Sequence, residues 1–149
     1  MKPTLWIIIG IVIGALALAF FVRIPSSNQK KAAISIGKTN INLEVADTDV
    51  LRTQGLSGRE SLASTTGMLF VFDESDTYGF WMKDMRFPLD IIWLDEQGVV
   101  VHIEYNVAPE TYPSVLTPNE KALYVLEVNA GVASELLIEK GTRLDIVFK

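Results

Sequence analysis

Apolar residues follow one another without a break from Leu5 to Val22, and Trp6 carries the only polar atom among their side chains. At about 1.5 Å rise per residue this run forms a helix of about 27 Å, close to the roughly 30 Å hydrocarbon core of a bilayer. A buried helix of a soluble domain normally carries a polar position in each turn, and this run has none. The pattern therefore predicts a transmembrane anchor within residues 1–23.

A cleaved signal peptide is the alternative interpretation of this run. Two small-x-small patterns, Ala15-Leu16-Ala17 and Ala17-Leu18-Ala19, resemble cleavage sites. Both lie inside the apolar run, with three more apolar residues to follow. We therefore favour an N-terminal segment that stays attached and anchors the protein.

The orientation of the anchor follows from two opposing arguments. Lys2 precedes the run and Arg23, Lys30 and Lys31 follow it, a count that leans toward a cytoplasmic domain. Long domains, however, translocate largely regardless of flanking charge. Because a single N-terminal anchor usually exports the domain behind it, we expect a single-pass membrane protein with an extracytoplasmic domain.

Alternation with a period of two dominates the chain after a polar linker at residues 24–32. In residues 41–45, Ile, Leu and Val alternate with Asn and Glu, which is typical of a half-buried strand. Residues 68–73 are largely apolar on both faces, which favours a central strand covered on both sides. About eight strands result, at residues 34–36, 41–45, 68–73, 80–85, 90–95, 99–105, 124–129 and 143–148. Gly37-Lys38 fits a hairpin turn between the first two.

Two short helices interrupt these strands. Asp47 or Thr48 is placed to cap a helix over residues 50–55, and Gly141 is placed to end one over 131–139. Three prolines predict a long surface loop at residues 106–121. The fold class is therefore mostly β (α+β), with a strongly curved sheet or partly closed barrel in one globular domain at residues 33–149.

Charge limits the partners of this domain. Of the 13 basic residues, Lys2 and Arg23 belong to the predicted anchor, which leaves 11 basic against 18 acidic residues and a net charge of −7 after residue 23. An acidic domain is repelled by phosphate backbones, so we expect no nucleic-acid partner. The chain has no cysteine, which excludes lipid attachment through a modified cysteine.

Charged residues within apolar segments are the candidates for chemistry. Trp81 and Lys83 would share one strand face and form a platform for an anion or a carbohydrate; alternatively, Trp81 fills the core and Lys83 reaches solvent. Asp90 and Glu127 stand in apolar strands, where a carboxylate needs a partner such as Arg59 or Lys83. The alternatives are an internal salt-bridge cluster, a pocket in which one carboxyl has a raised pKa, or, for Glu127, plain exposure.

Other motifs predict no metal site or cofactor. His102, the only histidine, alternates with apolar residues and is expected to be an exposed strand residue. Asp73, Glu74 and Asp76 form an acidic turn that lacks the Gly and distal Glu of a calcium loop. No phosphate-cradling loop, dinucleotide fingerprint or nucleophile elbow occurs.

Several segments in combination resemble an uncharacterised prokaryotic family, domain of unknown function 192. The resemblance covers residues 41–148 and rests on Gly55-Leu56-Ser57-Gly58-Arg59, Gly67-Met68-Leu69-Phe70, Phe80-Trp81-Met82-Lys83-Asp84-Met85, Leu89-Asp90 and Leu126-Glu127 with Gly131. The chain departs from the family pattern at Ser57, where Met is usual, and at Asp84-Met85, where Asn-Thr is usual. The resemblance implies a compact β-rich domain, often behind a signal or anchor, and no established activity.

Three hypotheses for the function remain open. The first is a membrane-anchored, non-enzymatic module that binds a small molecule, a glycan or a protein through Arg59, Trp81, Lys83, Asp90 and Glu127. The second is a hydrolase that uses Asp90 or Glu127 in a pocket lined by Arg59 and Lys83, or the two as a carboxylate pair. The third is a purely structural role. Convergence of these side chains on one pocket would distinguish the first two from the third.

Overall fold

The computed structural model describes residues 29–149. Residues 1–28, with the predicted anchor and most of the predicted linker, lie outside the described part. Within residues 29–149, no helix is both long and apolar enough to cross a bilayer. The first strand begins at Lys31 and so includes the last two residues of the predicted linker.

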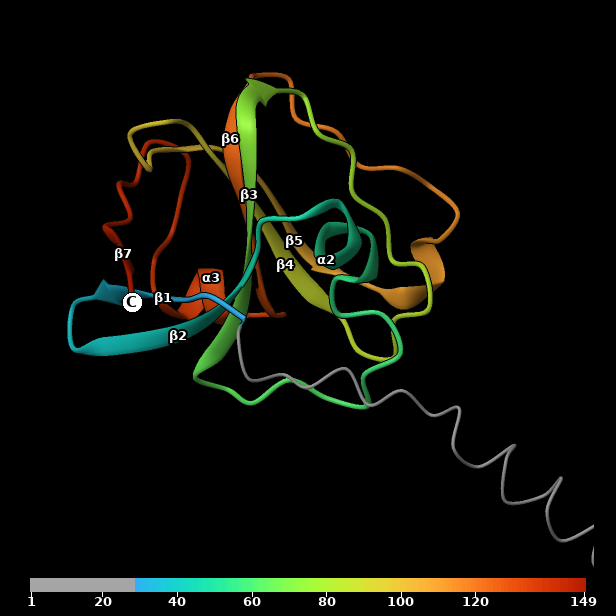
Figure 1. The fold of residues 1–149 in the computed structure, drawn as a ribbon. Coiled ribbons are helices and arrows are strands. Elements are labelled where there is room, and N and C mark those ends of the chain that lie inside the picture. The colour runs from blue at the N-terminus through green and yellow to red at the C-terminus, as the bar shows by residue number, and fades with distance from the viewer. Residues whose placement is uncertain (1–28) are drawn as a thin grey trace, which may run out of the picture.

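Seven strands form one mixed sheet (Figure 1). Its order is β5-β4-β6-β3-β2-β1-β7, with β2 and β3 parallel and every other neighbouring pair antiparallel. The strands are β1 (Lys31–Ile36), β2 (Thr39–Ala46), β3 (Thr66–Asp76), β4 (Leu89–Leu94), β5 (Val100–Val107), β6 (Ala122–Asn129) and β7 (Ile146–Phe148). Central positions for β3, β4 and β6 agree with their largely apolar sequences.

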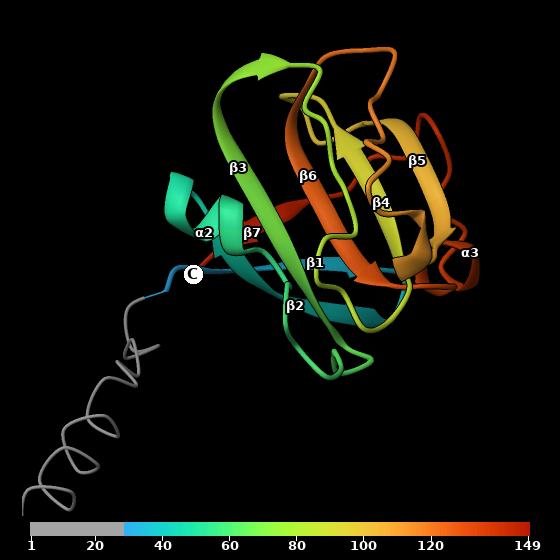
Figure 2. The same ribbon diagram turned by 90° about the vertical axis from the view of Figure 1, so that its right-hand side faces the viewer.

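The sheet is strongly curved but does not close. β1 and β2 run across the direction of β3 and β6 (Figure 2). The segment before β7 returns to the start of β5, where Val100 N donates to Thr142 O and Leu144 N donates to Gly98 O, each at 2.9 Å. The C-terminal segment therefore ties the two edges together without completing a barrel.

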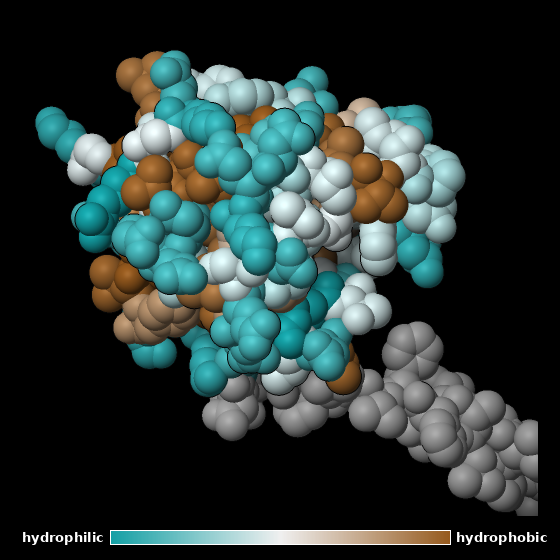
Figure 3. All heavy atoms as spheres, turned by 90° about the horizontal axis from the view of Figure 1, so that it is seen from above, coloured by the Kyte–Doolittle hydropathy of each residue, from teal (hydrophilic) through white to brown (hydrophobic). Residues whose placement is uncertain are grey.

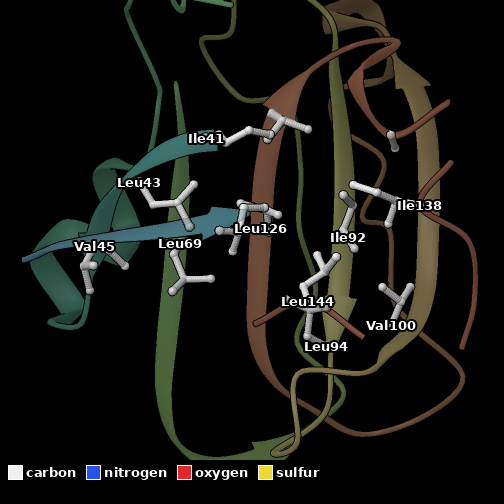
Figure 4. Close-up of a cluster of buried hydrophobic side chains, with 14 residues drawn as sticks. Ile41, Leu43, Val45, Leu69, Ile92, Leu94, Val100, Leu126, Ile138 and Leu144 are labelled. Atoms are coloured by element: carbon white, nitrogen blue, oxygen red, sulfur yellow. The ribbon is translucent and has the colours of Figure 1, made fainter. Parts of the chain in front are cut away.

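An apolar cluster, here called the inner core, fills the concave face. Side chains from β2, β3, β4 and β6 point toward one another there (Figure 4). The short helix α3 (Val132–Glu135) adds Ala133, and the C-terminal segment adds Leu144. The labelled members are Ile41, Leu43, Val45, Leu69, Ile92, Leu94, Val100, Leu126, Ile138 and Leu144.

A second apolar cluster, the outer core, lies on the opposite face of the sheet. Its buried members include Met68 and Phe70 of β3 and Trp93 of β4. No second sheet covers it among residues 29–149; instead, α2 (Asp49–Gln54) and the long connections on either side of β3 do so. On the face seen in Figure 3, polar side chains surround several small apolar areas.

Most local predictions are confirmed. The first two strands form a hairpin around Gly37, whose positive φ of 59° suits glycine, and Thr48 caps α2 by accepting from Leu51 N at 3.3 Å. β3 is buried on both faces, since Met68 lies in the outer core and Leu69 in the inner core. The proline-rich stretch is a loop with one short 3-10 helix, η2 (Pro109–Thr111).

The predicted strand at residues 80–85 is wrong. Only Phe80 makes a β-bridge, to Leu116, and the chain then turns at Asp84, whose φ is 56°. Phe80 and Met82 still point inward and pack in the outer core, which produces the alternation without strand pairing. Seven strands therefore replace the predicted eight. The predicted last strand and second helix are also shorter, and Leu137 follows α3 with a φ of 54°.

Candidate functional site

A pocket with a volume of about 290 Å³ opens on the outer face of the sheet, between α2, β3 and the connection to β4. We call it the outer pocket. Five aromatic side chains, all from residues 70–81, line it together with Met85: Phe70, Phe72, Tyr78, Phe80 and Trp81. Glu127 of β6 also lines it and is 5% exposed, so this carboxyl lies deep in the pocket.

Glu127 is buried in an apolar part of the sheet. Its direct neighbours on the adjacent strands are Met68 and Ile91, neither of which offers a polar side chain. Burial raises the pKa of Glu127 from its ordinary 4.5 to about 8, and the positive charge of Arg59 partly opposes the rise. Its carboxyl takes part in no side-chain hydrogen bond among residues 29–149, and because no side-chain oxygen there is both fully buried and unbonded, its oxygens are open to the pocket. At neutral pH Glu127 is therefore a mostly protonated acid facing the pocket.

Arg59 is held by a different carboxylate. Its Nη1 and Nη2 donate to Oε1 and Oε2 of Glu44 at 2.7 and 2.8 Å, a bidentate pair. This pairing lowers the pKa of Glu44 and raises that of Arg59. Arg59 therefore acts on Glu127 through its charge and makes no hydrogen bond to it.

Arg52, on α2, stands at the wall of the outer pocket. Its Nη1 donates to Val71 O at 2.6 Å and its Nη2 to Asp49 Oδ1 at 2.7 Å. The guanidinium lies 5.3 Å from the ring centroid of Phe72, which stacks on Tyr78 at 3.5 Å between centroids. This wall thus already places a cation over an aromatic ring.

Asp90 does not belong to the pocket, which corrects the expectation that it joins Glu127 there. In the β4–β6 pairing Asp90 stands opposite Val128, whereas Glu127 stands opposite Ile91, so the two carboxyls point to opposite faces of the sheet. Asp90 is fully buried and accepts from Asn106 N at 2.8 Å and from Ala133 N at 2.9 Å. It therefore fastens β5 and α3 to the inner face.

Of the five predicted site residues, the structure brings only Trp81 and Glu127 to the outer pocket. Trp81 is 49% exposed, whereas Lys83 lies in an exposed turn. The two residues therefore do not share a strand face. No sequence pattern singled out Arg52 or the other aromatic residues of the pocket. The signal that could have found them is the density of aromatic residues at positions 70–81, which a strand pattern also explains.

The described residues contain no group of three or more His, Asp or Glu side chains arranged to hold a metal ion. His102 lies on β5, where its Nε2 is 3.0 Å from Oε1 of Glu104 and its ring packs against Trp93. His102 therefore packs against residues of β4 and β5 and does not line the outer pocket.

The fold and the pocket define a small β-rich domain with one strongly curved, open sheet. This chain belongs to the DUF192 family, described as "Uncharacterized ACR", whose model matches residues 32–146. A candidate transcription regulator from Sinorhizobium meliloti 1021 has a similar crystal structure, with 30% identity, a TM-score of 0.72, and coverage of 79% of this chain and 93% of that one. A protein of unknown function from Novosphingobium aromaticivorans DSM 12444 has the same identity and TM-score, with 83% and 90% coverage. No curated protein matches this chain.

Proposed function

We propose that this protein is a binding module whose outer pocket takes up a small, largely apolar molecule and bonds its polar end to Glu127. One observation carries the proposal. In the described part of the chain, Glu127 is a carboxyl that is 5% exposed, makes no side-chain hydrogen bond to the protein, and opens into an aromatic pocket. Polar groups in folded proteins are nearly always bonded to protein or to water, so a ligand that enters the pocket would replace water at this carboxyl.

The size and lining of the pocket support a small ligand. Its volume of about 290 Å³ lies at the lower end of the range for small-molecule sites, roughly 300–1,000 Å³. Aromatic walls contribute a large apolar contact area, and one convergent polar group fixes orientation. We therefore place a ligand with one ring and one polar group ahead of a glycan or a protein.

The geometry does not support the hydrolase that the sequence suggested. Asp90 and Glu127 lie on opposite faces of the sheet, and Asp90 is occupied by two backbone N–H groups. Two carboxyls must flank one bond to perform glycoside hydrolysis as a pair. We therefore propose binding and not hydrolysis by this pair.

We do not propose that this domain contacts DNA directly. One structural neighbour is described as a candidate transcription regulator, but residues 24–149 of this chain carry a net charge of −7. Affinity for nucleic acid depends largely on basic groups that neutralise phosphates. We expect any regulatory role here to act through a ligand or a protein.

Blocking the pocket tests this function. A library of small aromatic compounds should contain members that raise the unfolding midpoint of the full-length protein in detergent by several degrees, because a ligand at about 100 times its Kd adds about 2.7 kcal/mol. Thr53 lines the pocket from α2, so Thr53→Trp should abolish these shifts.

Val50→Trp is the matched control for this experiment. Val50 lies on the same helix, is 73% exposed and does not line the outer pocket, so the control should respond like the wild type. The binding proposal fails if no compound shifts the midpoint, or if the shifts persist in Thr53→Trp.

We further propose that residues 5–22 anchor this module in a membrane with the domain on the extracytoplasmic side. The support is the uninterrupted apolar run, which lies outside the described residues.

The full-length protein should sediment with membranes and resist extraction by alkaline carbonate, whereas a chain beginning at residue 29 should stay in the supernatant. Protease added to intact cells stripped of any outer layer should cleave the domain. Full-length protein found dissolved with its first residues attached would contradict the anchor, and protection from protease would contradict the orientation.

A further inference from the structure

We infer that the ligand of the outer pocket carries an ammonium group that pairs with the carboxylate of Glu127. This inference rests on the proposed function and adds the chemical class of the ligand. It follows from the charges around the pocket, from the bonds that Glu127 lacks and from the aromatic walls.

The arginines near the pocket are each already paired. Arg59 is bound in bidentate fashion by Glu44, and Arg52 is bound by Asp49 and by a backbone carbonyl. The charges of the two arginines are thus cancelled by Glu44 and Asp49. When Glu127 ionises, its negative charge is therefore not compensated by these groups of the described residues. The missing counter-charge is a cation, and the acidic domain as a whole also attracts one.

The bonds that Glu127 lacks favour an ammonium that carries N–H groups. An ionised carboxylate accepts hydrogen bonds at both oxygens, and a primary ammonium offers three donors. A quaternary ammonium that displaced water from the pocket would supply charge without donors and would leave these oxygens unbonded. The inferred ligand is therefore a primary amine attached to an apolar or aromatic body.

The aromatic walls favour a cation as well. Ring faces attract cations within about 6 Å, by about 0.5–2 kcal/mol. The guanidinium of Arg52 already lies at 5.3 Å from the Phe72 ring, which shows that this wall can hold a cation. The remaining rings, Phe70, Tyr78, Phe80 and Trp81, line the same pocket as Glu127.

Binding then displaces a proton. At neutral pH the carboxyl is mostly protonated, so the ammonium binds as the carboxyl O–H proton passes to solvent and a carboxylate–ammonium pair remains. Arg59, from the loop after α2, is the charged group that acts on Glu127, and it is paired with Glu44 of β2, which lies on the same face of the sheet. Asp49 and Arg52 line the pocket from α2, and the Tyr78 hydroxyl donates to Glu74 O. β3 and β4 present Met68 and Ile91 to it.

Calorimetry of full-length protein in detergent tests this inference with 2-phenylethylamine and its neutral analogue, 2-phenylethanol. At pH 7 the amine should bind about tenfold more tightly or better, because only the amine supplies the missing charge. Its binding enthalpy should differ between phosphate and Tris buffers by the amount expected for release of about one proton per ligand. The affinity for the amine should rise about tenfold from pH 6 to pH 7 and level off above about pH 8.

Glu127→Gln should weaken amine binding about tenfold or more, abolish proton release, and change the affinity for the alcohol less than about threefold. Glu135→Gln, an exposed carboxyl on α3, is the matched control and should bind both compounds as the wild type does. Equal affinity for amine and alcohol in the wild type, or amine binding without proton release, would overturn the inference and leave pocket binding intact. Failure of both compounds to bind at millimolar concentration would count against the pocket function too. The pH series uses only wild-type protein, so it decides the matter even if the variant folds poorly.

Discussion

Glu127→Gln should stabilise the protein at pH 8.5 by on the order of 4 kcal/mol and change its stability at pH 5 by less than about 1 kcal/mol. The reason is that burial raises the pKa of Glu127 from 4.5 to about 8. Between these two pH values the folded protein binds one proton more than the unfolded chain does. The stability of the wild type therefore falls as the pH rises through this window and levels off above about pH 8, whereas glutamine has no proton to lose.

Urea denaturation at pH 5 and pH 8.5 measures this effect. The wild type should lose stability between the two values more steeply than Glu127→Gln does, and the exposed control Glu135→Gln should follow the wild type. Glu44 and Asp47 do not interfere, because their pKa values are lowered and their contributions are lost only on acidification. If the stability of the wild type and of Glu127→Gln changed with pH in parallel, Glu127 would be solvated. The proposed binding role of the pocket would then lose its main support.

Asp90→Ala should destabilise the protein by about 3–5 kcal/mol. Asp90 is fully buried and accepts from the backbone N–H groups of Asn106 and Ala133. Alanine would leave both donors without a partner and open a small cavity in the inner face. Since small domains have about 5–15 kcal/mol of stability in total, much of it would be lost. Asp90→Asn, which keeps one acceptor oxygen, should fall between wild type and alanine.

Equilibrium unfolding in urea measures this loss at pH 7. Asp145→Ala is the control: its side chain is 82% exposed, so the change should stay within about 0.5 kcal/mol. Folded Asp90→Asn should bind pocket ligands as tightly as the wild type, since Asp90 faces away from Glu127. Unchanged stability in Asp90→Ala would contradict the fastening role, and loss of ligand binding in folded Asp90→Asn would contradict the separation of the two faces.

Local sequence patterns predicted the elements whose stabilising contacts are close in sequence. The first hairpin follows from alternation on either side of Gly37, and α2 follows from the Thr48 cap. The same rule failed at Phe80 and Met82, which alternate in the same manner although their segment covers the outer core and pairs with no long strand. Alternation reports which side chains are buried, and the covering of a sheet can produce it as well as a strand can.

The sequence by itself determined a mostly β domain with an acidic surface, two buried carboxyl candidates and a dense aromatic segment. It could not distinguish Asp90 from Glu127, because each is a carboxylate among apolar residues. The pairing of β4 with β6 decided their roles. Asp90 pairs with Val128 and not with Glu127, so the two carboxyls lie on opposite faces of the sheet. Asp90 therefore meets two backbone donors, and Glu127 lines the pocket. The energy of a buried charge depends on which groups surround it, and only the tertiary structure brings those groups together.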